Sequence, residues 1–121
     1  MTAPKRTPPR RGERVAPPPT REEWDVVFAT SDAADGWEQL GRHAPGPTNE
    51  CWRRLRTGPL RVDKRQHPLK ARLSYRQVGS KRLGQWQYEV TGAGRVWYCP
   101  DPDQRTVWLT DASVGHPKAT E

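Results

Sequence analysis

The sequence predicts an α+β fold in which a hairpin of two helices packs on a mainly antiparallel sheet. In the first half of the chain apolar residues recur at helical spacing, and from about Leu69 onward they alternate with polar residues. A helix repeats about every 3.6 residues and a strand every two, so this change of period marks a change from helices to strands. One strand candidate precedes the helices, which gives the element order β-α-α-β-β-β.

The first twenty residues differ in composition from the rest of the 121-residue chain. Residues 1–20 hold six of the 13 prolines and five basic side chains against a single acidic one, Glu13. Such a segment buries too little apolar surface to offset the entropy lost on ordering. We expect a disordered basic tail over residues 1–20 and one domain over residues 21–121. The tail either contacts nucleic-acid phosphates or is a solvated leader without a dedicated partner.

Composition also excludes several classes of protein. The chain lacks a run of about 18 apolar residues that could span a membrane, and its basic N-terminus lacks the apolar stretch of a secretory signal. Cys51 and Cys99 form no CxxC pair, and the three histidines lack zinc spacing. We therefore expect a cytoplasmic protein with two reduced thiols, no metal and no small-molecule cofactor. Six tryptophans and no isoleucine predict a small core centred on aromatic residues.

The first strand is expected over residues 24–30, which are rich in β-branched and aromatic side chains. A helix follows, with Ser31 and Asp32 as its cap and acidic first turn. Its apolar stripe consists of Ala33, Trp37, Leu40 and Ala44. The string Pro45-Gly46-Pro47 is expected to end this helix.

A second helix is expected to begin at Thr48 and to stop at Gly58-Pro59. Its inward side carries Trp52 and Leu55, and its outer side carries Arg53, Arg54 and Arg56. Two consecutive short helices joined by a Pro/Gly turn indicate an antiparallel hairpin.

Four strands are expected in total after the helices, over residues 69–75, 85–90, 95–98 and 106–109, with turns at 91–94 and 101–103. In a simple meander the polar sides of these strands lie on one face of the sheet. That face would carry Lys70, Arg72, Gln87 and Arg95, with Lys81 or Arg82 from the loop between and His116 and Lys118 over its edge.

A basic face beside a histidine suits a phosphodiester. Arginine stabilises the charge that develops on phosphorus, and histidine transfers a proton near neutral pH. The same spacing also fits cations that only solvate one side of a half-buried sheet. The two glycines of residues 91–94 lie between strands rather than before a helix, so they indicate a turn and not a dinucleotide site. Asp101 and Asp103 flank Pro102, which is typical of a turn rather than of a metal site.

Several strings, in this order, resemble the RelE/ParE superfamily of toxins from bacterial toxin–antitoxin pairs. Leu69-Lys70-Ala71-Arg72-Leu73 is similar to the family's Leu-Lys-Gly-x-Leu strand start, and Gly94-Arg95-Val96-Trp97-Tyr98 to its Arg-apolar-apolar-Tyr strand. Gly115-His116 followed by a cation resembles its closing Gly-His-Arg segment. The resemblance covers residues 24–118 and is closest to an actinobacterial RelE-like branch described as a predicted cytotoxic translational repressor.

This resemblance implies a toxin that enters the ribosomal A site and cuts mRNA without metal. In that chemistry the 2′-hydroxyl attacks the adjacent phosphate. By position, Arg95 would stabilise the phosphorane, Lys70 would act as base or electrostatic partner, and His116 would be proton donor or base. The implied RNA-binding residues are Arg72, Lys81, Arg82, Gln87 and Lys118. Tyr98 lies three residues beyond Arg95, so it is expected to fill the core.

The chain also departs from the family pattern. Gln87 stands where active members often place a second arginine, Pro117 follows the histidine, and no tyrosine closes the chain. Two alternatives to the ribonuclease therefore stay open: a nucleic-acid- or protein-binding module with a degenerate active site, and a ParE-like inhibitor of DNA gyrase. With a net charge of +7, either toxin would pair with an acidic antitoxin, docked on the helical hairpin or on the basic face.

Overall fold

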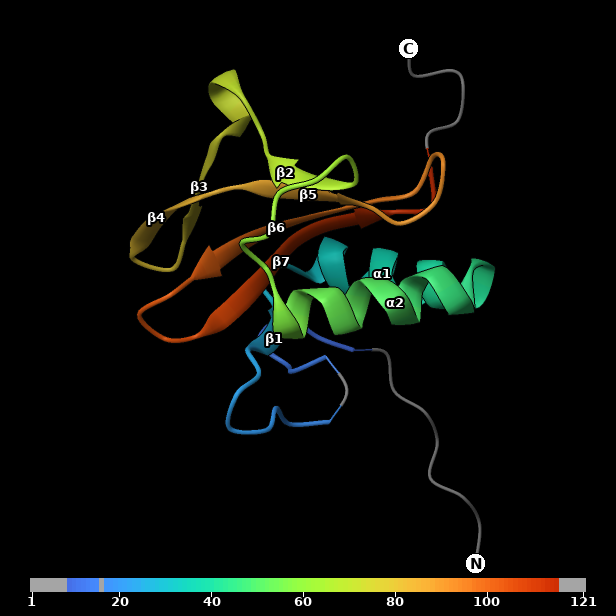
Figure 1. Ribbon diagram of the computed structural model, residues 1–121, viewed down its shortest axis with the longest axis horizontal. Coiled ribbons are helices and arrows are strands. Elements are labelled where there is room, and N and C mark those ends of the chain that lie inside the picture. Colours follow the sequence, from blue (N-terminus) through green and yellow to red (C-terminus); the bar gives the residue numbers. More distant parts are fainter. Residues whose placement is uncertain (1–8, 16, 116–121) are drawn as a thin grey trace, which may run out of the picture.

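The computed structural model describes residues 9–15 and 17–115, and within them it has the predicted α+β architecture (Figure 1). Both helices lie together on one side of the sheet, and the strands β3 and β4 are set apart from it (Figure 1). The elements in chain order are β1 (Asp25–Phe28), α1 (Ser31–His43), α2 (Pro45–Thr57), β2 (Gln66–Pro68), the 3₁₀ helix η1 (Ala71–Leu73), β3 (Tyr75–Val78), β4 (Lys81–Gly84), β5 (Trp86–Glu89), β6 (Arg95–Asp101) and β7 (Thr106–Ser113).

The main sheet has five strands in the order β1-β7-β6-β5-β2. Its strands pair antiparallel, except that β1 runs parallel to β7. The core lies between this sheet and the helices, and its largest fully buried side chains are those of Tyr88 and Tyr98. Trp37, Trp52 and Trp86 are only partly buried and pack against its margin. The core therefore contains aromatic residues as predicted, but its centre is tyrosine and aliphatic rather than tryptophan.

Both helix starts differ slightly from the prediction. Thr30 caps α1, since its Oγ1 accepts a hydrogen bond from the Ala33 amide at 2.9 Å. Helix α2 begins at Pro45 rather than Thr48, so Pro45-Gly46-Pro47 forms its first turn instead of a separate loop. Proline is favoured there because the first amides of a helix have no intrahelical acceptor.

The outer side of α2 is less cationic than predicted. Arg56 is buried, donates to Glu23 and lies over the Trp52 ring, with its Cζ 4.3 Å from the ring centroid. Arg54 pairs with Asp63 at 3.3 Å. Only Arg53 of the three arginines is fully exposed. The three side chains therefore do not form one exposed cationic surface.

Part of the expected tail is an ordered portion of the fold. The segment of residues 10–15, here called the N-terminal strap, runs beside β1, and Val15 is buried in the core. The Gly12 amide donates to the Phe28 carbonyl at 2.8 Å, and the Val15 amide donates to the Val26 carbonyl at 2.7 Å. The prediction of disorder over residues 1–20 is wrong for this segment. Val15 packs in the core and the backbone bonds to the open edge of β1, and neither contact can be read from the composition. Residues 1–8 lie outside the described residues.

The predicted strand at residues 69–75 is also wrong. The strand that pairs with β5 is β2, and the chain then leaves the sheet at Lys70 to form η1 and the β3–β4 hairpin. Ala71 has a φ of 57°, which is incompatible with a strand, and the Leu73 amide turns back to the Lys70 carbonyl at 3.2 Å. Residues 69–84 are here called the arm. The strands at 85–90, 95–98 and 106–109 are confirmed, and the last two extend further than predicted.

Candidate nucleic-acid interface

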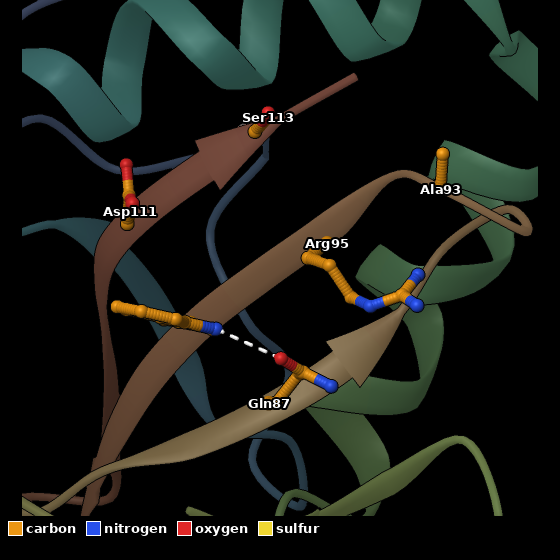
Figure 2. Close-up of a pocket in the computed structure, with 6 residues that line it drawn as sticks. Gln87, Ala93, Arg95, Asp111 and Ser113 are labelled. Atoms are coloured by element: carbon orange, nitrogen blue, oxygen red, sulfur yellow. Dashed lines mark hydrogen bonds between the residues drawn. The ribbon is translucent and has the colours of Figure 1, made fainter. Parts of the chain in front are cut away.

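The face of the sheet that points away from the helices carries two rows of side chains across β5, β6 and β7. Register places Gln87, Trp97 and Asp111 in one row, and Glu89, Arg95 and Ser113 in the next. An open cavity of about 760 Å³, here called the sheet cavity, lies over these rows. It is lined by residues of the three strands and of the turn beside them, namely Gln87, Ala93, Arg95, Trp97, Asp111 and Ser113 (Figure 2).

A β-bulge brings Asp111 into the sheet cavity. Trp97 pairs with Asp111 but its neighbour Tyr98 pairs with Leu109, so Thr110 is an extra residue in β7. Leu109 and Ala112 both face the core, which leaves Thr110 and Asp111 to share the outer side. A bulge of this kind changes the direction of a side chain without ending the strand.

The Trp97 ring is held in place by a hydrogen bond. Its Nε1 donates to Oε1 of Gln87 at 3.0 Å across the β5–β6 pair (Figure 2). Among the residues that the structure describes, Nε2 of Gln87 has no acceptor. The cavity therefore has an aromatic floor of fixed orientation beside an available amide donor.

Arg95 lies where the strand prediction placed it, at the start of β6. Its Nη1 donates to the carbonyls of Thr91, Gly92 and Gly94 at 3.1, 3.2 and 3.1 Å, so the guanidinium is held over the turn at 91–94. The other guanidinium nitrogens have no acceptor within the described part of the chain. One end of the side chain is thus fixed by the backbone, and the rest faces the cavity.

The sheet cavity is not the uniformly basic face that the sequence predicted. Arg95 is the one cation among its lining residues, and Asp111 offsets that charge. Lys70 and Arg72 are absent from the lining because residues 70–73 have left the sheet for η1. The predicted residues His116 and Lys118 lie outside the described residues. The described chain ends at Gly115, where a Cβ would lie 2.8 Å from the Cβ of Ala93 at the cavity rim.

The cations missing from the sheet cavity are gathered on the arm. Residues 69–84 contain five basic residues and no acidic one. Register and burial place Tyr75, Gln77 and Arg82 on the exposed side of the hairpin. The side chain of Tyr75 is conspicuous, since the residue is 52% exposed and Cζ of Arg82 lies 4.4 Å from its ring centroid. A cleft of about 250 Å³ between η1 and the hairpin is lined by Ala71, Arg72, Ser74, Tyr75, Arg76, Gln77 and Arg82.

The less exposed side of the hairpin faces the main sheet. There Lys81 binds the carboxylate of Asp101, with its Nζ 3.0 and 3.2 Å from the two oxygens. The Asp101 side chain is only 3% exposed, so this pair fixes the hairpin to the end of β6. Lys81 is therefore engaged in an intramolecular ion pair, and the expectation that its charge contacts RNA is not supported by its position.

Gln85 joins the base of the arm to the sheet. Its backbone amide donates to the Ser74 carbonyl at 2.8 Å, and its carbonyl accepts from the Leu69 amide at 2.9 Å. Its buried side chain donates to the Leu73 carbonyl at 2.9 Å and accepts from the Thr110 hydroxyl at 2.7 Å. A single glutamine thus connects both ends of the arm to β7.

The two thiols and the Tyr98 hydroxyl are buried. Cys51 and Cys99 are free thiols, as predicted, and burial raises the pKa of Cys99 to about 12 and also raises the pKa of Cys51. Tyr98 fills the core as predicted, where it donates to the Pro59 carbonyl at 2.9 Å and burial raises its pKa. These three groups are protonated at neutral pH and are inaccessible to a polymeric substrate.

Neither helix in residues 9–15 and 17–115 is long and apolar enough to cross a membrane. The same residues contain no cluster of three or more histidine, cysteine, aspartate or glutamate side chains that could hold a metal ion.

Sequence reasoning missed four residues that define these two sites. The juxtaposition of Trp97 and Asp111 was not predicted, because cross-strand register and the bulge, rather than any linear motif, bring them together. Tyr75 and Arg76 were expected at the end of a strand and in the loop after it. Their position between Arg72 and Arg82, in a stretch without acidic residues, could have indicated a cationic surface with an aromatic residue. Comparisons with models of protein families, with curated proteins and with solved structures found no match.

Proposed function

We propose that this protein binds single-stranded RNA along the arm and the adjoining outer face of the sheet. The observation that carries the proposal is the composition of the arm, which has five basic residues, no acidic one and an exposed tyrosine. With Lys81 paired to Asp101, the cations available for phosphates are Lys70, Arg72, Arg76 and Arg82. A cationic surface that interleaves arginine with an aromatic ring is typical of proteins that bind unpaired strands.

The residue types favour RNA that is not base-paired. A guanidinium binds phosphate through two N–H groups and also stacks on aromatic rings, as Arg82 already does on Tyr75. Bases can stack on such side chains only when they are free of a duplex. The sheet cavity, with its aromatic floor and polar walls, supplies a second place for such a base.

Fluorescence anisotropy with a labelled RNA of about 12 nucleotides tests the proposal. The double variant Arg72→Gln/Arg82→Gln should bind about 10-fold more weakly at low salt, and the slope of log K against log salt should fall by about 1.4 for two lost phosphate contacts. The matched control is Arg42→Gln/Arg53→Gln, which removes the same charge from exposed positions on the helices. Equal weakening by both variants would show binding to net charge alone and would reject the arm as the site.

A second candidate function is the ribosome-dependent, metal-independent mRNA endoribonuclease implied by the RelE-like resemblance. The observation that favours it is the guanidinium of Arg95, fixed at one end and open to the sheet cavity at the other. In this reaction the 2′-hydroxyl would attack the adjacent phosphorus, the bond to the 5′-oxygen would break, and Arg95 would stabilise the intermediate charge. Lys70 would have to act from the arm, and His116 stays a predicted proton donor.

Primer extension on cellular mRNA after brief induction in a bacterial host separates the two candidates. Cuts inside translated frames that are present with wild type and absent with Arg95→Ala and His116→Ala would establish the nuclease. Circular dichroism of both variants shows whether lost cleavage reflects lost folding. Growth arrest without cuts would favour the gyrase inhibitor, and folded protein with neither arrest nor cuts would favour a binding module.

An acidic antitoxin is the partner that the nuclease candidate requires, and it stays a prediction. On the helical hairpin, Arg54 and Arg56 are ion-paired with Asp63 and Glu23. The arm carries cations that are not ion-paired, so it is the better surface for an acidic partner. Such a partner would compete with RNA for the arm, in the cytoplasm where both ligands occur. A small open reading frame for an acidic protein beside this gene would be the first sign of it.

A further inference from the structure

We infer that the sheet cavity is a binding site for a single nucleobase, stacked on Trp97 and recognised by Asp111, with a preference for guanine. The inference deepens the proposed RNA binding and rests on it, because it names the base that an RNA bound on the outer face would insert. It concerns residues that the arm does not include, so the two proposals can be tested apart.

The first argument is the fixed orientation of the Trp97 ring. Its Nε1 hydrogen bond to Gln87 and its central position in the row Gln87–Trp97–Asp111 hold the ring between two polar neighbours. A tryptophan whose only role was packing would be expected on the helix-covered side, where Val96 and Tyr98 already fill the core. An aromatic ring presented in an open cavity is instead a stacking surface for a base.

The second argument is the pattern of polar groups around that ring. Oδ1 of Asp111 accepts from the Ala112 amide at 3.0 Å, which fixes the carboxylate, while Oδ2 has no donor in the described part of the chain. Across the ring, Nε2 of Gln87 is an available donor. A ligand that stacks on Trp97 therefore meets an acceptor on one side and a donor on the other (Figure 2).

Guanine fits this pattern better than the other bases. Its Watson–Crick edge carries two adjacent donors, N1–H and the N2 amino group, which a carboxylate can accept together, and its O6 accepts from an amide. Cytosine and adenine offer Asp111 one amino group, and uracil offers one donor, N3–H, between two carbonyl oxygens that a carboxylate repels. Arg95 lies in the neighbouring row, where it can contact the phosphate attached to the bound nucleoside.

Charge and size also favour a base over a free anion. Asp111 lines the cavity, so a phosphate alone would meet a carboxylate beside the guanidinium of Arg95. The volume of about 760 Å³ lies within the range of small-molecule sites, about 300–1,000 Å³.

Isothermal titration calorimetry with GMP, AMP, CMP and UMP tests the inference directly. Wild type should bind GMP most tightly and UMP least. Trp97→Ala should weaken GMP binding at least about 10-fold, whereas Trp97→Phe should retain most of it because the aromatic surface remains. Asp111→Asn should abolish the preference for GMP over UMP, since the amide presents a donor beside its acceptor.

The helix variant Arg42→Gln/Arg53→Gln is the matched control and should bind GMP as wild type does, since both residues are exposed on the helices and neither lines the sheet cavity. Equal affinity for the four nucleotides, or GMP binding that Trp97→Ala leaves unchanged, would overturn the inference. If the labelled RNA binds through the arm but GMP does not bind, the base site fails and the proposed function stands. If GMP binds at Trp97 but the RNA does not bind, the proposed function fails and the base site stands.

Discussion

The two faces of the main sheet are built from the same strands and have opposite characters. The face toward α1 and α2 is closed, apolar and filled by residues such as Tyr88, Val96 and Leu109. The outer face is polar, is partly covered by the arm and leaves Trp97 and Asp111 accessible in a cavity. Because neighbouring residues of a strand point to opposite faces, stability and binding can be altered separately along a single strand. The following predictions test that separation.

The largest effect is expected on the helix-covered face. A Cβ at Gly36 would lie 1.9 Å from the Ala112 carbonyl oxygen, so Gly36→Ala forces α1 away from β7. We expect a loss of about 3 kcal/mol in the free energy of unfolding, measured by urea denaturation. Gly41→Ala is the control in the same helix, since nothing lies near its Cβ position, and it should stabilise the protein by about 0.5–1 kcal/mol. Similar midpoints for both variants would contradict this close approach.

An intermediate effect is expected where the arm joins the outer face. Gln85→Ala removes the hydrogen bonds to Leu73 and Thr110 and leaves both groups unsatisfied, at a cost of about 2 kcal/mol. Since the same residue positions the arm, RNA affinity should fall as well, even at temperatures where the variant is folded. Gln39→Ala, at an exposed position on α1, should change neither quantity. Unchanged RNA affinity in folded Gln85→Ala would show that the arm does not need this anchor.

A smaller effect is expected from the thiol of Cys99 on alkaline titration. Burial raises its pKa from 9.0 to about 12, so the folded state favours the protonated form. Its contribution to stability should be complete below about pH 9 and should decline between pH 9 and about 12, as the thiol ionises more readily in the unfolded chain. Urea midpoints measured across this range should fall less steeply for Cys99→Ala. A slope identical to that of wild type would show that other groups account for the decline.

The smallest effect is expected at Glu23, which lies outside both faces of the sheet and bonds to Thr20 and Arg56. The Thr20 amide and the charge of Arg56 lower the pKa of Glu23 below its usual 4.5. The resulting stabilisation is present above about pH 4.5 and should be lost as the pH falls through the lowered value. Glu23→Gln should make the acid side of the stability profile flatter, whereas Glu22→Gln, at an exposed neighbouring position, should leave it unchanged. Thermal melts between pH 3 and 6 distinguish the two.

The sequence predicted the parts of the fold that follow from periodicity, and it failed where a single residue changes the path of the chain. The helices and the strands at β5, β6 and β7 have regular apolar spacing, so they could be located. The turn at Ala71 could not be located, since nothing in a run of alternating residues signals a positive φ at an alanine. Gln66 begins the true edge strand as a fully buried polar residue, against the usual tendency of glutamine to be exposed.

The candidate site was predictable to a similar extent. Arg95 was located because its strand was located. Lys70, Arg72 and Arg82 were expected on the same face of the sheet as Arg95, whereas the structure places them on the arm. Asp111 depends on the bulge at Thr110, which only the register with β6 reveals. The pairing of Lys81 with Asp101 depends on how the hairpin folds back, and no local pattern encodes it.

The parallel pairing of β1 with β7 joins the beginning of the fold to its end. Val26 can pair with Val107 only after nearly the whole domain has been synthesised. Forming this pair closes one of the longest loops available to the chain, which is entropically costly. A ribosome that stops before β7 would release a chain in which β1 and β6 both lack the strand that pairs with them. Truncated products should consequently be unfolded and open to proteolysis, so that only the full-length chain reaches a functional state.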